Sequence, residues 1–332
     1  MDKQDNRTEY LLEVEDLRVE FPVGGGFLRK EKQMLRAVDG VSFKIKPGET
    51  LGIVGESGCG KSTIGNTIIR LLKETGGQIR FKGTDITKLS KKELNPYRRQ
   101  MQMIFQDPFS SLNPRKKVFD IIAEPFRVQT NLSGEEMRDR IYRMMELVGL
   151  DREYADRYPH EFSGGQRQRI GIARALALNP ELVICDEPVS ALDVSIQAQI
   201  LNLLKDLQEE LNLTYIFIAH GMPAVQYISD RIAVMYLGKI MEIAPVDELF
   251  AHTMHPYTEG LLSAIPIPDP VLRDERQESI LEGDLPSPLD LPKGCRFCSR
   301  CRYVKDLCRE REPEFAEKEP GHFVCCHFPL EH

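Results

Sequence analysis

The sequence contains no apolar run close to the ~18–20 residues that a membrane-spanning helix needs. Its first residues, MDKQDNRTEY, lack the apolar core of a secretory signal peptide. It also lacks an excess of positive charge, because 51 acidic residues outnumber 44 basic ones and the net charge is −7. These absences argue against a membrane span, secretion and a nucleic-acid footprint, and they predict a protein that stays in the cytoplasm.

The stretch around which the chain is organised is residues 55–63, GESGCGKST, which directly follows an apolar, strand-like segment. Gly55, Gly58 and Gly60 allow the backbone to curl, so that successive N–H groups point at phosphate oxygens. A helix expected from near Lys61 adds its positive end to the same anion site. A glycine turn that only caps a helix is the alternative, but the strand before and the helix after favour a nucleoside triphosphate site.

The same pattern predicts the chemistry at the phosphates. Lys61 can reach the β- and γ-phosphates, and the Ser62 hydroxyl can bind Mg²⁺. Residues 182–185 form an apolar strand that delivers Asp186 and Glu187 at its carboxyl end, where ligands bind in open α/β sheets. Asp186 can then hold the Mg²⁺ water shell, and Glu187 can orient and polarise the attacking water.

Hydrophobic periodicity predicts an α/β fold with a parallel sheet and an antiparallel piece near the N-terminus. Strands are expected at 11–21, 41–45, 50–54, 78–82, 101–105, 182–185, 214–219, 232–236 and 239–243, and the last two should form a hairpin around Leu237 and Gly238. Helices are expected at 61–72, 133–148, 169–178 and from about 193 to 211. Ser133 and Glu136 predict a capping box for the second of these helices, and Asp193 or Ser195 caps the last. The apolar face of that last helix is expected to contain Ile196, Ile200, Leu203, Leu207 and Leu211. A rise in proline content after His255 predicts a domain boundary, with a nucleotide-binding domain at 1–250, its helical subdomain at about 107–179, and a C-terminal extension at 251–332.

Residues 162–169, FSGGQRQR, resemble the signature of the ATP-binding cassette (ABC) ATPases. In the same order as in that family, Gln106 matches the Q-loop glutamine, residues 190–193 (SALD) the D-loop, His220 the switch histidine and Phe21 the adenine-stacking aromatic. The resemblance implies a P-loop NTPase of ABC type, with a RecA-like core, an antiparallel β subdomain and a helical subdomain. One position departs from the family pattern, because Gly221 replaces the aspartate that usually follows the histidine and could loosen the loop there.

The resemblance also implies roles for individual residues. Catalytic roles fall to Glu187, His220 and Gln106, and Mg²⁺ ligation to Ser62, Gln106 and Asp186. Contacts to ATP are implied for Phe21, Gly55, Ser57, Gly58, Cys59, Gly60, Lys61, Ser62, Thr63, Gln106, Ser163, Gly165, Gln166 and Asp186. Because Ser163, Gly165 and Gln166 would cap the γ-phosphate of ATP held by another subunit, a chain with one phosphate loop and one signature must form a head-to-tail dimer.

Several stretches are similar to the ATPase subunits of bacterial dipeptide and oligopeptide importers, namely 106–114, 158–161 and 255–266. This resemblance implies a second, non-identical ABC ATPase subunit, two transmembrane permease subunits and, indirectly, an extracytoplasmic peptide-binding protein. It places the chain on the cytoplasmic face of the membrane as a peripheral subunit. The alternatives are a nickel importer ATPase of the same group, or an ABC ATPase that acts on nucleic acid or ribosomes without transport.

Six of the eight cysteines lie between Cys295 and Cys326, a crowding that suggests metal ligation in a reducing compartment. The resemblance implies a [4Fe–4S] cluster on Cys295, Cys301, Cys308 and Cys326, which would hold together a small, irregular, Pro-rich extension. The spacing alone also permits a C-x-x-C-x-x-C set that includes Cys298, a tetrahedral Zn²⁺ site, or plain reduced thiols. Two further cysteines, in the phosphate loop and the 182–185 strand, are expected to be small packing residues.

Overall fold

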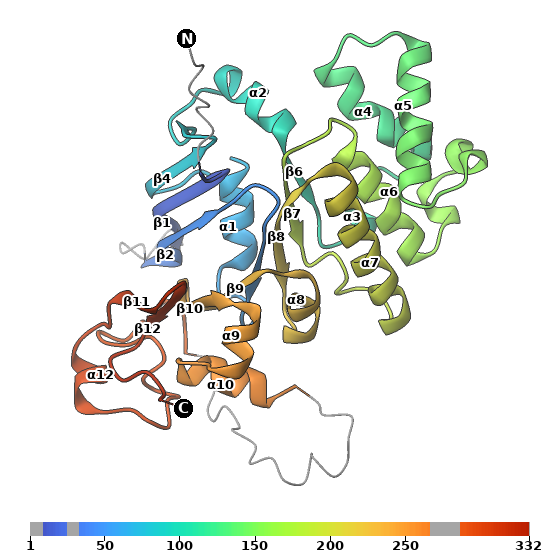
Figure 1. Cartoon of the computed structure of the whole chain (residues 1–332). Coiled ribbons are helices and arrows are strands. Elements are labelled where there is room, and N and C mark those ends of the chain that lie inside the picture. The colour runs from blue at the N-terminus through green and yellow to red at the C-terminus, as the bar shows by residue number, and fades with distance from the viewer. Residues whose placement is uncertain (1–8, 25–32, 266–285, 332) are drawn as a thin grey trace, which may run out of the picture. The chain divides into compact units, whose positions relative to one another are not determined.

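The computed structural model describes residues 9–24, 33–265 and 286–331 (Figure 1). By its internal contacts the chain forms two compact units. The helical unit comprises residues 1–13, 44–50 and 80–219, and the phosphate-loop unit comprises residues 14–43, 51–79 and 220–332.

Three parallel strands form the sheet of the helical unit, in the order β8-β7-β6. They are β6 (Met101–Ile104), β7 (Leu182–Asp186) and β8 (Thr214–Ala219). In this register Met101 lies opposite Leu182, and Leu182 lies opposite Thr214. All residues of β7 and β8 are buried, which explains why these strands read as continuous apolar runs rather than as alternating ones.

Several helices of this unit begin at side-chain caps that the sequence encodes. Ser133 and Glu136 form the predicted capping box of α5, and Ser163 forms a second one with Gln166 at the start of α6. Helix α6 therefore begins at Gly164, earlier than the predicted start at residue 169. Helices α4, α5 and α6 pack against one another (Figure 1). The helices up to α6 are α2 (Lys91–Gln100), α3 (Pro108–Ser111), α4 (Val118–Gln129), α5 (Gly134–Leu147) and α6 (Gly164–Leu176), with 3-10 turns at Arg152–Asp156 and Pro159–Glu161.

The longest helix, α7 (Val194–Leu211), begins at Asp193, whose carboxylate accepts the N–H of Ile196. This selects Asp193 over Ser195, which the sequence left as an alternative cap. The buried stripe runs through Ile200, Leu204 and Leu207. Of the predicted stripe only Ile200 and Leu207 are buried, whereas Ile196, Leu203 and Leu211 are half-buried. Leu201 and Leu204 are buried in their place.

The sheet of the phosphate-loop unit combines parallel and antiparallel pairs, in the order β11-β12-β10-β9-β3. Strand β3 (Thr50–Val54) runs parallel to β9 (Arg231–Tyr236), which forms the predicted antiparallel hairpin with β10 (Lys239–Pro245). Leu237 and Gly238 connect these strands with φ values of 43° and 82°, the left-handed pair that a tight two-residue hairpin turn requires. Asn, Asp or Gly would be usual at the first position, but Leu237 occupies it here.

A second sheet is built from the N-terminal strands, in the order β2-β1-β4-β5. These are β1 (Leu12–Val23), β2 (Gln33–Ile45), β4 (Gly76–Phe81) and β5 (Thr84–Asp85). Strand β2 extends further toward the N-terminus than the predicted 41–45. Helix α1 (Lys61–Ile68) is shorter than expected, because the chain turns at Arg70, whose φ is 60°, and Leu71 and Leu72 lie beyond its end.

The C-terminal extension contains more regular structure than the sequence predicts. Helices α8 (Met222–Ile228) and α9 (Val246–Ala251) precede it. Its own elements are α10 (Pro256–Ser263), α12 (Asp306–Glu310), β11 (Phe315–Glu319) and β12 (His322–Cys325). Strand β12 pairs antiparallel with β10, so the extension adds two strands to the sheet. Most of the Pro-rich stretch 266–292 lies outside the described residues.

Glu242, a fully buried carboxylate on β10, fastens these pieces together. It accepts hydrogen bonds from the backbone N–H groups of Met254 (2.6 Å) and His255 (3.2 Å) and from the Thr253 hydroxyl (3.1 Å). His322 of β12 contacts the same carboxylate through Nε2, at 2.7 Å. A buried charge is tolerated only when its lone pairs are satisfied, and these donors supply that compensation.

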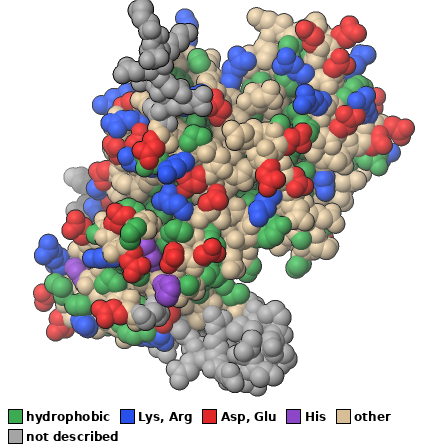
Figure 2. All heavy atoms as spheres, viewed as in Figure 1, with side chains coloured by type: hydrophobic (Ala, Val, Ile, Leu, Met, Phe, Trp, Pro, Cys, Tyr) green, Lys and Arg blue, Asp and Glu red, His purple; other side chains and the backbone are tan. Residues whose placement is uncertain are grey.

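Within the described residues, no helix is long and apolar enough to cross a membrane. On the face that Figure 2 shows, Lys and Arg side chains are interspersed with Asp and Glu side chains.

Replacing Glu242 with Ala should destabilise the protein by about 3–5 kcal/mol, because several buried donors lose their acceptor at once. Chemical denaturation checks this, with Glu319→Ala as the matched control. Glu319 is exposed on β11, so its loss should cost less than about 0.5 kcal/mol. Equal losses for the two variants would contradict the role given to Glu242.

Candidate functional site

The phosphate loop occupies the predicted place, between the buried strand β3 and helix α1. Its glycines are required by close backbone contacts. A Cβ atom on Gly55 would lie 2.1 Å from the Met235 carbonyl oxygen, and one on Gly60 would lie 2.1 Å from that of Ala37. Gly60 also has a φ of 105°, which L side chains rarely adopt. The loop backbone is thus pressed against β2 and β9, and only glycine fits at these two positions.

Lys61 is the cation of this loop. Its side chain is buried, and its Nζ donates to the carbonyl oxygens of Gly55 (2.7 Å) and Glu56 (3.2 Å). The ammonium group is therefore held at the centre of the curled loop. There it can exchange its hydrogen bonds to carbonyl oxygens for hydrogen bonds to phosphate oxygens. Cys59 is buried, and burial raises the pKa of its thiol, in agreement with its predicted packing role. Ser62 and Thr63, on the first turn of α1, are partly exposed.

Strand β7 of the helical unit ends at the two predicted carboxylates, both buried. Glu187 has a φ of 48°, a left-handed conformation that is uncommon for a residue with a side chain and often found at functional sites. Gln106 follows the neighbouring strand β6, and its Nε2 donates to Glu187 Oε2 at 2.6 Å. The structure therefore brings together the predicted Q-loop glutamine and the predicted water-orienting carboxylate.

The signature motif forms the first turn of α6. Exposed Ser163 is its N-cap, with the Gln166 N–H donating to Ser163 Oγ at 3.3 Å and the Ser163 N–H donating to Gln166 Oε1 at 3.1 Å. A Cβ atom on Gly165 would lie 2.6 Å from Cγ2 of Ile196, so glycine allows α7 to approach α6 closely. The exposed helix N-terminus provides an anion-binding end.

The remaining predicted residues lie on surface segments. Phe21 is a half-buried residue of β1, and Ser57 and Gly58 are exposed in the phosphate loop. His220 is exposed directly before α8. Gly221 has φ −102° and ψ 133°, an ordinary extended conformation, and a Cβ atom there would meet only Pro223 at 3.7 Å. The backbone beside His220 therefore does not depend on glycine.

A group of residues that the sequence did not predict also contacts the phosphate loop. Glu56 is bound by Arg300 and Tyr257, both from the C-terminal extension. No sequence pattern could have paired residues 56 and 300. The only signal was the acidic residue itself, inside a loop that binds anions.

Five cysteines and two histidines line a single cavity of about 20 Å³ in the extension. The cysteines are Cys295, Cys298, Cys301, Cys308 and Cys326. All four predicted cluster ligands are among them, and Cys298 is present as well. Cys325 is not, because its thiol donates to the Pro313 carbonyl oxygen.

The five thiols lie together around this cavity. Burial, with a smaller contribution from the neighbouring thiols, raises the pKa of Cys295 to about 12 and that of Cys326 to about 11. Within the described residues, no group of three or more His, Cys, Asp or Glu side chains is arranged to hold a metal ion. The cavity has room for about one water, so an iron–sulfur centre would require the thiol-bearing loops to lie further apart than they do here. Thiols are suitable ligands for an iron–sulfur centre, but these thiols lie too close together to hold one in this arrangement.

Comparison with known proteins identifies the class. Residues 38–190 match the ABC transporter family, and residues 241–308 match the oligopeptide/dipeptide transporter C-terminal region. The chain is 55% identical to the oligopeptide transport ATP-binding protein AppF of Bacillus subtilis (strain 168), over 96% of this chain and 97% of that protein. The chain belongs to the ABC transporter ATPases.

Other relatives agree with this assignment. The oligopeptide transport ATP-binding protein OppF of Haemophilus influenzae is 51% identical, over 97% of this chain and 98% of its own. Among solved structures, the ATP-binding cassette MJ0796, as a dimer bound to ADP and Pi, has a TM-score of 0.63 at 30% identity and covers 71% of this chain and 98% of its own. CbiO1 from Clostridium perfringens has a TM-score of 0.65 at 30% identity and covers 74% and 92%. These likenesses confirm the predicted P-loop fold of ABC type.

Substituting three glycines by Ala should distinguish a glycine required because a Cβ atom would clash from one required because its φ is positive. Gly60→Ala should cost more than about 3 kcal/mol, because the new Cβ meets a backbone oxygen. Gly58→Ala should cost about 1–2 kcal/mol, since its φ is 78° but the space around it is open. Gly221→Ala should change stability by less than about 0.5 kcal/mol. Urea unfolding gives the order, and equal costs at the three positions would contradict it.

Proposed function

We propose that this chain is the ATP-hydrolysing subunit that powers import of dipeptides or oligopeptides through a membrane ABC transporter. The observation that carries the proposal is identity of 51–55% to oligopeptide transport ATP-binding proteins over nearly the whole chain. The match includes the C-terminal region named for oligopeptide and dipeptide transporters, at residues 241–308. Because the resemblance extends beyond the ATPase core, it supports peptide transport rather than an ABC ATPase activity without transport.

The residues around the nucleotide are assigned as the sequence indicates. The phosphate loop from Gly55 to Thr63, with Ser57, Gly58, Cys59 and Gly60, offers its N–H groups to the phosphates, and Lys61 neutralises them. Ser62, Gln106 and Asp186 hold Mg²⁺, and Phe21 stacks on the adenine. Glu187 orients the attacking water, and His220 assists at the γ-phosphate. The Gln106–Glu187 hydrogen bond supports this pairing of roles.

Partners follow from the family. Ser163, Gly165 and Gln166 cap the γ-phosphate of ATP bound to a second, non-identical ABC ATPase subunit in a head-to-tail dimer, which requires the exposed first turn that α6 has. The dimer works on two permease subunits from the cytoplasmic face of the membrane, and an extracytoplasmic binding protein delivers the peptide. Residues 1–250 act as the nucleotide-binding domain, with a helical subdomain at about 107–179, and residues 251–332 as the extension.

Glu187→Gln should leave ATP binding intact and lower hydrolysis by ~10²–10⁴-fold, because only the water-orienting carboxylate is lost. The new amide oxygen can still accept the Gln106 hydrogen bond. Steady-state phosphate release, assayed with the partner subunits present, measures the effect. Undiminished turnover would remove Glu187 from this role.

Two companion variants separate binding from chemistry. Lys61→Ala should fail at nucleotide binding, because a positive charge opposite the β- and γ-phosphates is lost. His220→Ala should bind ATP but hydrolyse it poorly. Calorimetry distinguishes the two, and normal ATP affinity in Lys61→Ala would contradict the assignment.

For the extension we propose a [4Fe–4S] centre on Cys295, Cys301, Cys308 and Cys326. It is supported by the four thiols, which line one cavity. Such a centre, or Zn²⁺ in its place, would supply structural cross-linking, and its binding would release the thiol protons. The chain's own residues also hold the extension, through β12 and Glu242.

Purified without oxygen, the protein should be brown and contain about four irons per chain. Ser at any one of the four proposed ligands should bleach it and expose the chain beyond about residue 255 to protease, whereas Cys298→Ser and Cys325→Ser should not. The Cys325 variant is the stricter control, because its thiol lies outside the cavity. A colourless protein with one zinc per chain would show that zinc, and not an iron–sulfur cluster, occupies the site. A metal-free protein with a protease-resistant extension would overturn both.

A further inference from the structure

Glu56, the second residue of the phosphate loop, is bound at all three of its polar groups. Its carboxylate accepts hydrogen bonds from both terminal guanidinium nitrogens of Arg300, with Nη1 2.7 Å from Oε2 and Nη2 3.0 Å from Oε1. Its N–H donates to the Tyr257 hydroxyl at 3.0 Å, and its carbonyl accepts from Lys61. Two of these three partners belong to the C-terminal extension, more than 200 residues further along the chain.

The Arg300–Glu56 pair is sheltered from solvent. The Arg300 side chain is 6% exposed and that of Glu56 is 26% exposed. A forked, charge-assisted pair of this kind fixes both orientation and distance, and partial burial reduces its screening by salt. Arg300 therefore holds the carboxylate in one place instead of offering a loose surface contact.

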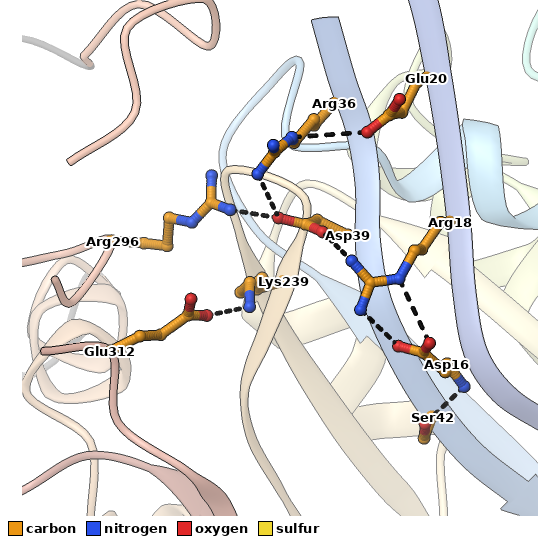
Figure 3. A network of polar contacts seen from close by, with 9 residues as sticks. All are labelled: Asp16, Arg18, Glu20, Arg36, Asp39, Ser42, Lys239, Arg296 and Glu312. Carbon is orange, nitrogen blue, oxygen red and sulfur yellow. Dashed lines mark hydrogen bonds and ion pairs between the residues drawn. The ribbon is translucent and has the colours of Figure 1, made fainter. Parts of the chain in front are cut away.

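The segment that carries Arg300 is itself held firmly on both sides. Phe297 packs against both Tyr236 and Tyr257, with ring centroids 5.4 and 5.3 Å away. Arg296 forms a buried ion pair with Asp39, which also binds Arg18 at 2.9 Å (Figure 3). The position of Arg300 is thus determined by aromatic packing and by a network that reaches β2.

The charge of Glu56 matters because its neighbours must bind a polyanion. An unpaired carboxylate in this loop would repel the phosphates, and Arg300 cancels that charge locally. The Tyr257 hydroxyl accepts a hydrogen bond from the backbone N–H of Glu56 and so fixes the orientation of that peptide group. Both contacts favour the loop conformation in which Lys61 and the following N–H groups face the ligand, so less ordering is needed when ATP binds.

We infer that Arg300 and Tyr257 are positioning residues for ATP: they act through Glu56, so that the C-terminal extension sets the nucleotide affinity of the phosphate loop. This inference rests on the proposed function, because it assumes that the loop binds ATP. Neither side chain touches the nucleotide in this scheme. The extension therefore has a role in the motor itself, beyond its place in the transporter family.

Arg300→Gln in the full-length subunit should weaken binding of a non-hydrolysable ATP analogue about 5- to 50-fold, the usual range for coupling between two sites. Glu56→Gln added to Arg300→Gln should restore the affinity to within about threefold of wild type, since the unpaired charge is then gone. Arg300→Lys, which keeps the charge but not the fork, should fall in between. Additive losses in the double variant would overturn the inference.

Two matched controls come from the next residues of the chain. Arg302 pairs with Glu259 and its side chain is 52% exposed, so Arg302→Gln should bind the analogue like wild type. Tyr257→Phe removes only the hydroxyl and should weaken binding about three- to tenfold, whereas Tyr303→Phe should not. If Arg300→Gln and Tyr257→Phe lower the melting temperature but bind as tightly as the controls, their role is structural and the inference is wrong.

The coupling must also act in reverse, because binding free energies are reciprocal. The analogue should slow amide hydrogen exchange in residues 295–301 of wild type and do so much less in Arg300→Gln. Equal protection in both proteins would contradict the inference. A wild-type chain that does not bind the analogue, or Lys61→Ala that binds it equally well, would instead refute the proposed ATP site.

Discussion

Backbone contact at the phosphate loop is the constraint on which the phosphate-loop unit depends. The loop can curl around an anion only because Gly55 and Gly60 let it lie directly on the carbonyls of Met235 and Ala37. That contact joins the loop to the hairpin strand β9 and to β2. Since protein interiors are close-packed and bistable rather than deformable, a shift of either strand must move the loop with it. The affinity for phosphate is therefore a property of the whole unit, and not of nine residues.

The sequence was sufficient for most elements of the fold and for the positions of the candidate site residues at the ends of β3, β6 and β7. Local signals explain this success: a glycine loop between strand and helix, two carboxylates after an apolar strand, and a cap followed by a Glu or Gln three residues on. The Gln106–Glu187 contact could be expected because their strands are neighbours in a parallel sheet. The predicted start of α6 at residue 169 was wrong, because Ser163 and Gln166 form a capping box that starts the helix at Gly164.

What local signals could not show are the pairings across long stretches of chain. No pattern in residues 315–325 predicts that they extend the sheet that contains β3. Nor does the sequence around Glu242 predict that this carboxylate is buried against four polar groups of the extension. The crowded cysteines predict that a metal centre holds the extension together. The described part of the extension is also held by strand pairing, aromatic packing and ion pairs such as Lys239–Glu312 (Figure 3). Such contacts depend on register and burial, which only tertiary structure decides.

Strand β12 has one more consequence, which concerns how the protein behaves in a crowded solution. Without it, β10 would be the edge of the sheet, and β10 is a buried, apolar strand whose interior charge, Glu242, is already engaged. Exposed edges of that kind recruit strands from other molecules. With the extension in place the outermost strand is β11, which ends in the exposed charges Glu317, Lys318 and Glu319. The extension thus replaces an apolar edge strand by a charged one, which disfavours strand pairing between copies of the subunit.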